Sequence, residues 1–192
     1  WTAFEGTDTT WSIAYIETDA SGRPLSPAYR VTTTEKKGRF VIVKDVFTDP
    51  DRQSLMVRFT VKSAAGKITP YLILDPSMAN TSGDDEGRVA GGALQAWEGK
   101  VALSASASVP FVKANVGYTG VSDGVADLTA HQTLGTVHAA LDKGRGNIVL
   151  VGELPAVSGN STFNVAVGFG ATTAAADASA QGTLKTGYAE VL

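Results

Sequence analysis

Residues 55–62 read LMVRFTVK, with apolar side chains at every second position. As a strand, the segment would direct Leu55, Val57, Phe59 and Val61 inward and Met56, Arg58, Thr60 and Lys62 outward. A helix would scatter the first four residues around its axis, whereas a half-buried strand gathers them on one face. The segment therefore predicts a β-strand with one face in a core.

Neighbouring segments extend the same pattern in both directions. Residues 29–34 and 39–47 enclose a polar turn and predict a hairpin. With 55–62 and 70–74, they predict a four-stranded antiparallel meander over residues 29–74. Further strands are predicted at 94–97, 100–107, 135–141, 147–154 and 163–168, and an irregular excursion at 80–92. Strands separated by turns, without interleaved helices, favour an all-β fold, a large antiparallel β-sandwich over residues 1–170.

Residues 171–192 follow a helical pattern instead. Thr172 is placed to cap a helix, and Leu184, Tyr188 and Val191 recur at helical spacing as one apolar stripe. Because the helical pattern stops mid-stripe at Leu192, we expect the start of a linker helix toward a further domain beyond it. Trp1 is not a natural start residue, so we also expect the chain to be trimmed at its N-terminus.

The composition excludes several classes of protein. The net charge is −3 and the basic residues are dispersed, so the chain lacks the concentrated basic surface of a nucleic-acid binder. Apolar runs such as residues 148–151 are far shorter than a bilayer span, which argues against a membrane protein. Without cysteine, the chain can form no disulfide, thiolate nucleophile or cysteine-based zinc site.

Two groups of residues are candidate metal ligands. Asp84, Asp85 and Glu86 offer hard oxygen ligands from a flexible loop, which suits calcium, although their spacing is not that of an EF-hand. His131 and His138 are the only histidines, and no third ligand at a suitable spacing completes a zinc site around them. We therefore assign no metal site, and calcium stays an open alternative for the acidic loop.

Residues 117–124 read GYTGVSDG, which combines three glycines with Ser122 and Asp123. This combination predicts a tightly folded structural loop whose polar side chains hold its backbone, formed by Gly117, Gly120, Ser122, Asp123 and Gly124. The nearby pair Asp123 and Asp127 could be read as the paired acids of a glycoside hydrolase, but the structural role is favoured. No catalytic residue is nominated in this chain.

Several segments, in their order along the chain, resemble the N-terminal domain of bacterial glucoamylases and glucodextranases, which belong to glycoside hydrolase family 15. They are residues 28–33, 38–40, 48–55, 74–76, 80–87, 109–111, 117–124, 146–154 and 167–170. The resemblance covers nearly the whole chain, and residues 117–124 are its most specific part.

The resemblance implies a supersandwich-like antiparallel domain, joined by a linker helix to an all-helical catalytic barrel. In that family the barrel releases glucose from the ends of α-glucans with inversion, using two glutamates as general acid and general base. The matching positions would lie beyond Leu192, so the chain is expected to be a non-catalytic accessory domain. Its implied partners are the barrel and, through it, an α-glucan, in a secreted or periplasmic bacterial protein.

The chain departs from the family pattern at two places. Val125 stands where the family commonly has an aromatic residue after the Ser-Asp-Gly triplet. The first strands of the family domain would precede Trp1, so we expect a sandwich with an open sheet edge.

A hypothesis from another class is a free-standing carbohydrate-binding module. Such modules stack sugars on exposed aromatic rings, and Trp1, Trp11, Trp97 and Tyr118 are the available rings. Within this group, Tyr118 and Trp97 are the residues that we expect to contact carbohydrate.

Overall fold

The structure, a computed structural model, describes residues 1–81, 83–141 and 144–192, so Ser82 of the predicted excursion and the pair 142–143 lie outside the described part. The strands are β1 (Thr9–Tyr15), β2 (Tyr29–Glu35), β3 (Phe40–Thr48), β4 (Ser54–Ile68), β5 (Tyr71–Leu74), β6 (Glu86–Ala90), β7 (Ala93–Glu98), β8 (Val101–Ala107), β9 (Lys113–Tyr118), β10 (Ile148–Glu153) and β11 (Val157–Gly170). The helices are the 3-10 helix η1 (Met78–Asn80), α1 (Gly124–His131), α2 (Thr173–Thr186) and α3 (Tyr188–Val191).

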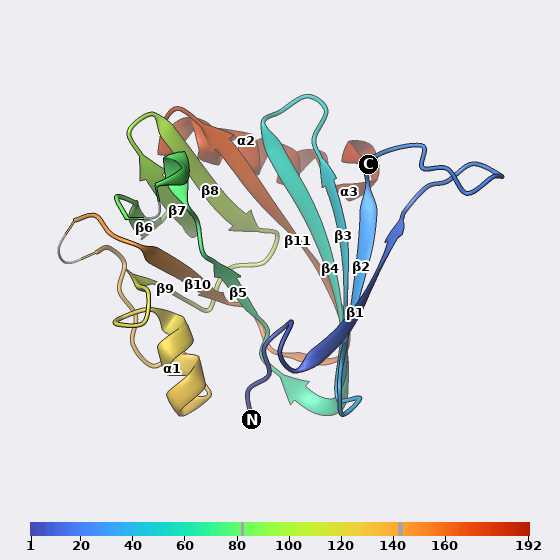
Figure 1. Cartoon of the computed structure of the whole chain (residues 1–192), viewed down its shortest axis with the longest axis horizontal. Coiled ribbons are helices and arrows are strands. Elements are labelled where there is room, and N and C mark those ends of the chain that lie inside the picture. The colour runs from blue at the N-terminus through green and yellow to red at the C-terminus, as the bar shows by residue number, and fades with distance from the viewer. Residues whose placement is uncertain (82, 142–143) are drawn as a thin grey trace.

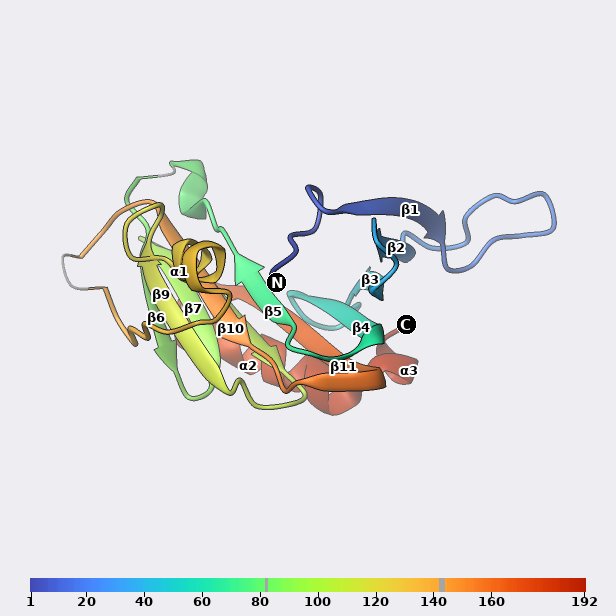
Figure 2. The same cartoon turned by 90° about the horizontal axis from the view of Figure 1, so that it is seen from below.

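The strands of the described residues form two antiparallel sheets (Figure 1). The large sheet has the order β1-β2-β3-β4-β11-β8-β7-β6, and the small sheet has the order β5-β10-β9. The small sheet packs on one face of the large sheet, here called the inner face, and α2 lies across the other face (Figure 2). This arrangement confirms the predicted all-β sandwich.

The main core lies between the two sheets. The large sheet contributes Leu94 and Ala105, and the small sheet contributes Val116, Ile148 and Leu150, all of them almost fully buried. Burying side chains of this size stabilises the fold by about 1.5–3 kcal/mol each, so this core holds the layers together.

α2 approaches the large sheet closely because β11 presents a glycine to it. A Cβ atom on Gly168 would lie 2.0 Å from the carbonyl oxygen of Ala176, so no side chain fits at this position. Ala176 and Ala180 are the buried helix residues at the contact. Small residues on both elements therefore fix the helix on the sheet.

The position of the C-terminal helices corrects one prediction for residues 55–62. Val61 is buried toward the small sheet, as predicted, but Met56, predicted to point outward to solvent, is fully buried. Met56 packs with Phe47, Ala28 and Val191 in a cluster on the other face of the large sheet. The strand is covered on both faces here, because the C-terminal helices lie over it.

The predicted meander is correct for its first three strands and wrong for the fourth. β2, β3 and β4 are antiparallel neighbours, but β5 pairs with β10 in the small sheet. Pro70 precedes β5 and has no backbone N–H to donate to a ladder. The chain leaves the large sheet at this point and crosses to the other layer.

Residues 135–141, predicted as a strand, form no strand. They run between the edge strands of the two sheets, where Ala139 accepts a hydrogen bond from Val89 N–H (2.8 Å) and His138 accepts one from Val116 N–H (3.0 Å). The segment therefore hydrogen-bonds to β6 in the large sheet and to β9 in the small sheet, without forming a continuous ladder with either strand.

Three strands were not predicted: β1, β6 and β9. β6 lies within the predicted excursion at 80–92, and it forms a hairpin with β7 through Gly91 and Gly92. Both glycines have positive φ, 59° and 80°, as a two-residue hairpin turn requires. The adjacent glycines were a readable hairpin signal inside a stretch that otherwise looked irregular.

The predicted C-terminal helix is present but interrupted. Thr172 caps α2 by accepting a hydrogen bond from Ala175 N–H, and the helix ends at Gly187, whose φ is 88°. α3 then brings Tyr188 and Val191 of the predicted stripe onto Phe47. Within the described ranges, no helix is long and apolar enough to cross a bilayer.

Candidate functional site

The loop at residues 117–124 connects β9 to α1 and forms one wall of the candidate site. Ser122 N–H donates to the carbonyl of Tyr118 (3.1 Å), and the Ser122 hydroxyl accepts a hydrogen bond from Tyr118 N–H (3.1 Å). A Cβ atom on Gly117 would lie 2.1 Å from the Ser122 carbonyl oxygen, so the loop closes only over glycine. The turn continues through Gly120, whose φ is 72°.

Asp123 joins this loop to α1. Its carboxylate accepts hydrogen bonds from Gly120 N–H, in the loop, and from Ala126 N–H (2.7 Å), in the first turn of the helix. It is therefore the N-cap of α1, and it satisfies a donor that the helix start leaves unpaired. The next residue, Gly124, packs against Leu134 and Val151 so closely that a Cβ atom would lie 2.7 Å from the Leu134 side chain.

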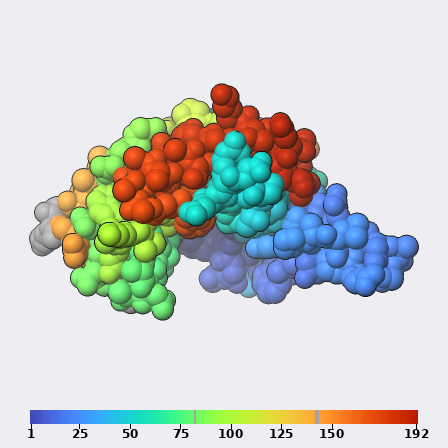
Figure 3. All heavy atoms as spheres, turned by 90° about the horizontal axis from the view of Figure 1, so that it is seen from above, coloured from blue at the N-terminus to red at the C-terminus, as the bar shows by residue number. Residues whose placement is uncertain are grey.

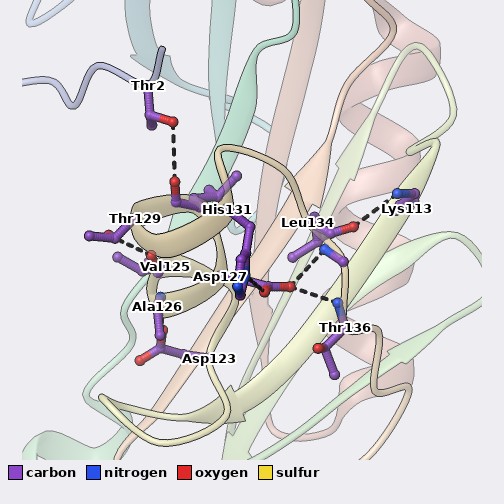
Figure 4. Close-up of polar contacts among 12 residues, drawn as sticks. Thr2, Lys113, Asp123, Val125, Ala126, Asp127, Thr129, His131, Leu134 and Thr136 are labelled. Carbon is purple, nitrogen blue, oxygen red and sulfur yellow. Dashed lines mark hydrogen bonds and ion pairs between the residues drawn. The ribbon is translucent and has the colours of Figure 1, made fainter.

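Asp127 ties the segment after α1 back onto the helix (Figure 4). One carboxylate oxygen accepts hydrogen bonds from Gly135 N–H and Thr136 N–H, both at 2.6 Å, and the other contacts His131 Nδ1 at 2.9 Å. The hydrogen bond from Thr136, followed by that from His131, lowers the pKa of Asp127 below its usual value. Asp127 is therefore an ionised structural clamp, since a carboxylate bonded to two amides is stabilised in its charged form.

Two adjoining hollows lie beside this loop and helix. The first, about 180 Å³, is lined by Val116, Tyr118, Ser122, His138, Ala140 and Leu141. The second, about 380 Å³, shares Ser122 and His138 with the first and adds Asp123, Asp127, His131 and Thr136. The structure thus brings both histidines, the loop serine and Tyr118 to one concave surface.

Tyr118 lies at the inner end of this surface. Its ring packs against Gly146 so closely that a Cβ atom on that glycine would lie 2.7 Å from the ring. The Tyr118 hydroxyl donates to the carbonyl of Gly144 (3.4 Å). The half-buried ring also packs against the core between the sheets. The exposed part of the ring could stack on one sugar ring, while the neighbouring hydroxyl and imidazole groups offer hydrogen bonds.

Trp97, the other predicted sugar contact, lies elsewhere. It is on β7 in the large sheet, half-buried, and the Arg88 guanidinium stands 5.4 Å from its ring. Arg88 also donates to the Thr173 hydroxyl at the start of α2 (3.1 Å), which places Trp97 on the helix-covered face. Tyr118 and Trp97 therefore cannot contact the same sugar unit.

The acidic loop places its three carboxylates in different surroundings. Asp85 is fully buried and accepts a hydrogen bond from Met78 N–H (2.9 Å), Glu86 pairs with Arg145 (3.4 Å), and Asp84 is exposed. Burial, reinforced by the charges of Glu98, Asp75 and Asp84, raises the pKa of Asp85 despite the Met78 hydrogen bond. Among the described residues, no three His, Asp or Glu side chains converge to hold a metal ion, here or around the two histidines.

The sequence pattern did not predict α1 or the clamp at Asp127. The available signal was an N-cap aspartate at 123 followed by Asp127 in the first helical turn, directly after the glycine-rich loop. The amide partners of Asp127 lie eight and nine residues away in irregular chain, and no short-range pattern encodes them.

Comparison with known proteins places this fold in a defined group. The family model described as "Glucodextranase, domain N" matches residues 2–192. A glucoamylase from Clostridium sp. (strain G0005) is 32% identical over 152 residues, which cover 76% of this chain and 21% of the glucoamylase. The crystal structure of a bacterial glucoamylase complexed with acarbose superposes with a TM-score of 0.85 at 27% identity, covering 96% of this chain and 27% of that chain.

Proposed function

Because this chain belongs to the glucodextranase domain N family, a domain type found in glucoamylases, we propose that it is the non-catalytic accessory domain of an α-glucan hydrolase. The parent would be exo-acting and inverting, and would release glucose from polysaccharide ends. Such a parent would work outside the bacterial cytoplasm, secreted or periplasmic, where polymeric glucans are met.

The observation that carries this proposal is the ratio of the matched lengths. The match to the solved glucoamylase covers 96% of this chain but only 27% of that protein. The chain spans about a fifth of the length of the Clostridium glucoamylase. More than two thirds of each relative lies outside the match and offers ample room for a catalytic domain, which we propose as the partner of this one.

Two carboxylates with shifted pKa values, Asp85 and Asp127, are unsuited to glycosidase catalysis. A glycosidase general acid needs a raised pKa and access to the glycosidic oxygen. Asp85 has the raised pKa but is fully buried, and Asp127 has a lowered pKa and is occupied by backbone amides. Neither carboxylate can serve as that acid.

The connection to the catalytic domain would begin at residues 171–192, after a sandwich over 1–170. α2 is anchored to the large sheet by Ser104 Oγ, which donates to Asp177 (3.0 Å), and by Thr183 Oγ1, which donates to Asp49 (2.5 Å). A connection that starts docked on the sheet would hold the catalytic domain in a fixed orientation rather than on a flexible tether.

The test is to assay glucose release from maltooligosaccharides by this chain and by the parent protein in parallel. The proposal expects turnover by the parent and none by the purified 192-residue chain. Turnover by the chain alone, or a parent without any further helical domain, would contradict it.

A free-standing carbohydrate-binding module is the second candidate, and the hollow beside Tyr118 is the observation that favours it. Titration with maltoheptaose, followed by intrinsic fluorescence, would compare Tyr118→Ala with Tyr15→Ala as a control on a different surface. Saturable binding that only Tyr118→Ala abolishes would support this candidate, and a flat response in the unsubstituted chain would reject it.

A further inference from the structure

The two edges of the large sheet differ in what covers them. At one edge, Val89 N–H on β6 donates to the carbonyl of Ala139 (2.8 Å), so irregular chain lies along this strand. At the other edge, β1 is the outermost strand, and no backbone group in the described part of the chain pairs with its outer side (Figure 2). The space-filling view shows the N-terminal residues at one end of the molecule (Figure 3). A free edge of this kind presents unpaired N–H and C=O groups to another strand.

The hydrogen bonds between β1 and β2 identify the groups that face the free edge. Lys36 N–H donates to the carbonyl of Asp8 (3.0 Å), just before β1 begins. Ile16 N–H donates to the carbonyl of Ala28 (3.0 Å), just after β1 ends. Because residues that bond to the neighbouring strand alternate with residues that do not, the even-numbered residues of β1 bond to β2. The residues whose N–H and C=O groups point outward are Thr9, Trp11, Ile13 and Tyr15.

β1 lacks the features that usually prevent pairing at an exposed edge. Natural edge strands carry charged side chains or proline, or are bent by a bulge, and each of these features keeps a second strand away. The sequence of β1, TTWSIAY, contains no charged residue and no proline. Its register with β2 is continuous from Thr9 to Tyr15, so no bulge bends the strand. β1 is therefore able to accept a strand along its whole length.

We propose that β1 pairs with β1 of a second copy of this chain, antiparallel about a two-fold axis at Ser12, so that the two large sheets become one. This register places Trp11 opposite Ile13 of the second copy. It also places Tyr15 opposite Thr9 of the second copy, so that all the outward-facing residues exchange hydrogen bonds across the axis. A register shifted by two residues would pair one of them outside the strand. A contact of one surface with itself closes at two copies, and it does not depend on the proposed function.

The side chains of β1 favour the same register. Directly paired residues share a face of the sheet, so Trp11 and Ile13, which are 65% and 58% exposed, would pack together across the two copies. The two-fold axis repeats this contact on its other side. Pairs of an aromatic and a β-branched residue are among the cross-strand contacts that stabilise antiparallel strands. Such a pair would therefore lie on each side of the axis, at the centre of the contact.

Charges at the two ends of β1 are complementary in this arrangement. Lys36 Nζ donates to the carbonyl of Thr7 (2.6 Å), so the ammonium group lies at the start of the free edge. The proposed register places Thr7 opposite Glu17 of the second copy, which is an exposed residue. By symmetry, the same opposite charges meet at the other end of the contact. Complementary charges at both ends select this register and this partner, a second copy of the chain.

Sedimentation equilibrium of the 192-residue chain tests the proposal directly. A contact made by one strand pair is small, so the weight-average mass should be 19.8 kDa in dilute solution and approach twice that value only at about 500 µM. A mass that stays at one chain throughout would overturn the proposal. A mass that rises beyond two chains would also overturn it, because a two-fold contact cannot grow further.

Two substitutions at one position separate edge pairing from a general loss of apolar surface. Ile13→Pro removes an outward N–H that β2 does not use, and proline is tolerated at such edge positions. It should raise the dissociation constant at least about tenfold, whereas the matched control Ile13→Val, which keeps the N–H, should raise it by less than about threefold. Circular dichroism should show the same strand content in both variants. Equal dissociation constants for the two folded variants would overturn the proposal.

A charge exchange tests the register without changing β1. Glu17→Lys and Lys36→Glu should each raise the dissociation constant at least about threefold at an ionic strength of about 10 mM, and the double variant should recover most of the loss. Lys37→Glu, on the turn beside Lys36, is the matched control and should have a smaller effect than either. A double variant that associates no better than the single variants would contradict the register. None of these measurements records hydrolysis, so their failure would leave the proposed function untouched.

Discussion

The two ends of the large sheet differ in how many of their faces are covered. Around β11 and β8, the small sheet lies on one face and α2 on the other, so that Val165 and Ala166, neighbours in sequence, are both buried. On β1, every residue after Thr9 is exposed. The same sheet is therefore buried on both faces at one end and exposed to solvent along its edge strand at the other. In this chain, substitutions should lower the free energy of unfolding strongly at the first end and change it little at the second.

Gly168→Ala should have the largest effect, because its Cβ atom would lie 2.0 Å from the Ala176 carbonyl oxygen. The helix backbone would have to move, and we expect a loss of about 3 kcal/mol in the free energy of unfolding, measured in urea. Ser12→Val, which adds bulk on exposed β1, is the matched control and should change stability by less than about 0.5 kcal/mol. Equal costs at the two positions would remove the distinction between the two ends.

Thr183→Val should rank second. Thr183 Oγ1 donates to Asp49 (2.5 Å), and both residues are buried where α2 meets the turn after β3. Burial raises the pKa of Asp49, but hydrogen bonds from Thr183, Asp51 N–H and Arg52 outweigh it and hold the pKa below its usual value. Valine keeps the shape of the side chain and removes the donor, so the free energy of unfolding should fall by about 2 kcal/mol. Thr10→Val on β1 should be nearly neutral in the same urea titration, and a similar loss there would refute the ranking.

Asp85→Asn should raise the free energy of unfolding at neutral pH, in contrast to the two losses above. Burial raises the pKa of Asp85 above its ordinary value of 3.8, so the folded state binds the proton more tightly than the unfolded state. The resulting stability is complete below the ordinary pKa, falls as the pH rises through the folded-state pKa, and stays low at neutral pH.

Asparagine carries no charge, and its side-chain oxygen can still accept the hydrogen bond from Met78 N–H. We therefore expect a gain of about 1 kcal/mol at pH 7 and almost none at pH 3, followed by thermal unfolding at both pH values. A gain of the same size at the two pH values would show that the charge of Asp85 is not the cause.

Ile13→Thr should have the smallest effect in this chain. The side chain is 58% exposed and contributes little buried area, so stability should change by less than about 0.5 kcal/mol. Calorimetry measures this effect, and a loss as large as that of Thr183→Val would contradict the exposure of β1.

The sequence predicted the parts of the fold that local periodicity determines. The alternation at 55–62 predicted β4, and the apolar positions toward the small sheet were correctly chosen at Val61. The burial of Met56 could not be predicted, because it depends on a helix more than 115 residues later in the chain. The position of β5 in the small sheet could not be predicted for a related reason, because a short apolar strand of this kind fits either sheet.

The candidate site shows the same division. The glycines and Asp123 predicted a tight loop, and the hydrogen bonds of Ser122 and Asp123 give physical reasons for it. The convergence of His131, His138 and Tyr118 depends on how residues 134–141 return over α1 through Asp127, which no local motif encodes. Equally, aromatic content alone could not reveal that Tyr118 and Trp97 lie in different sheets.

The most direct test of the proposed function is a proton NMR record of the first minutes of maltoheptaose hydrolysis by the parent protein. An inverting exo-acting enzyme releases glucose as the β-anomer, which then mutarotates, while the 192-residue chain under the same conditions should leave the substrate unchanged. Initial release of α-glucose, or release of oligosaccharides in place of glucose, would contradict the proposal that this chain is the accessory domain of an inverting, exo-acting α-glucan hydrolase.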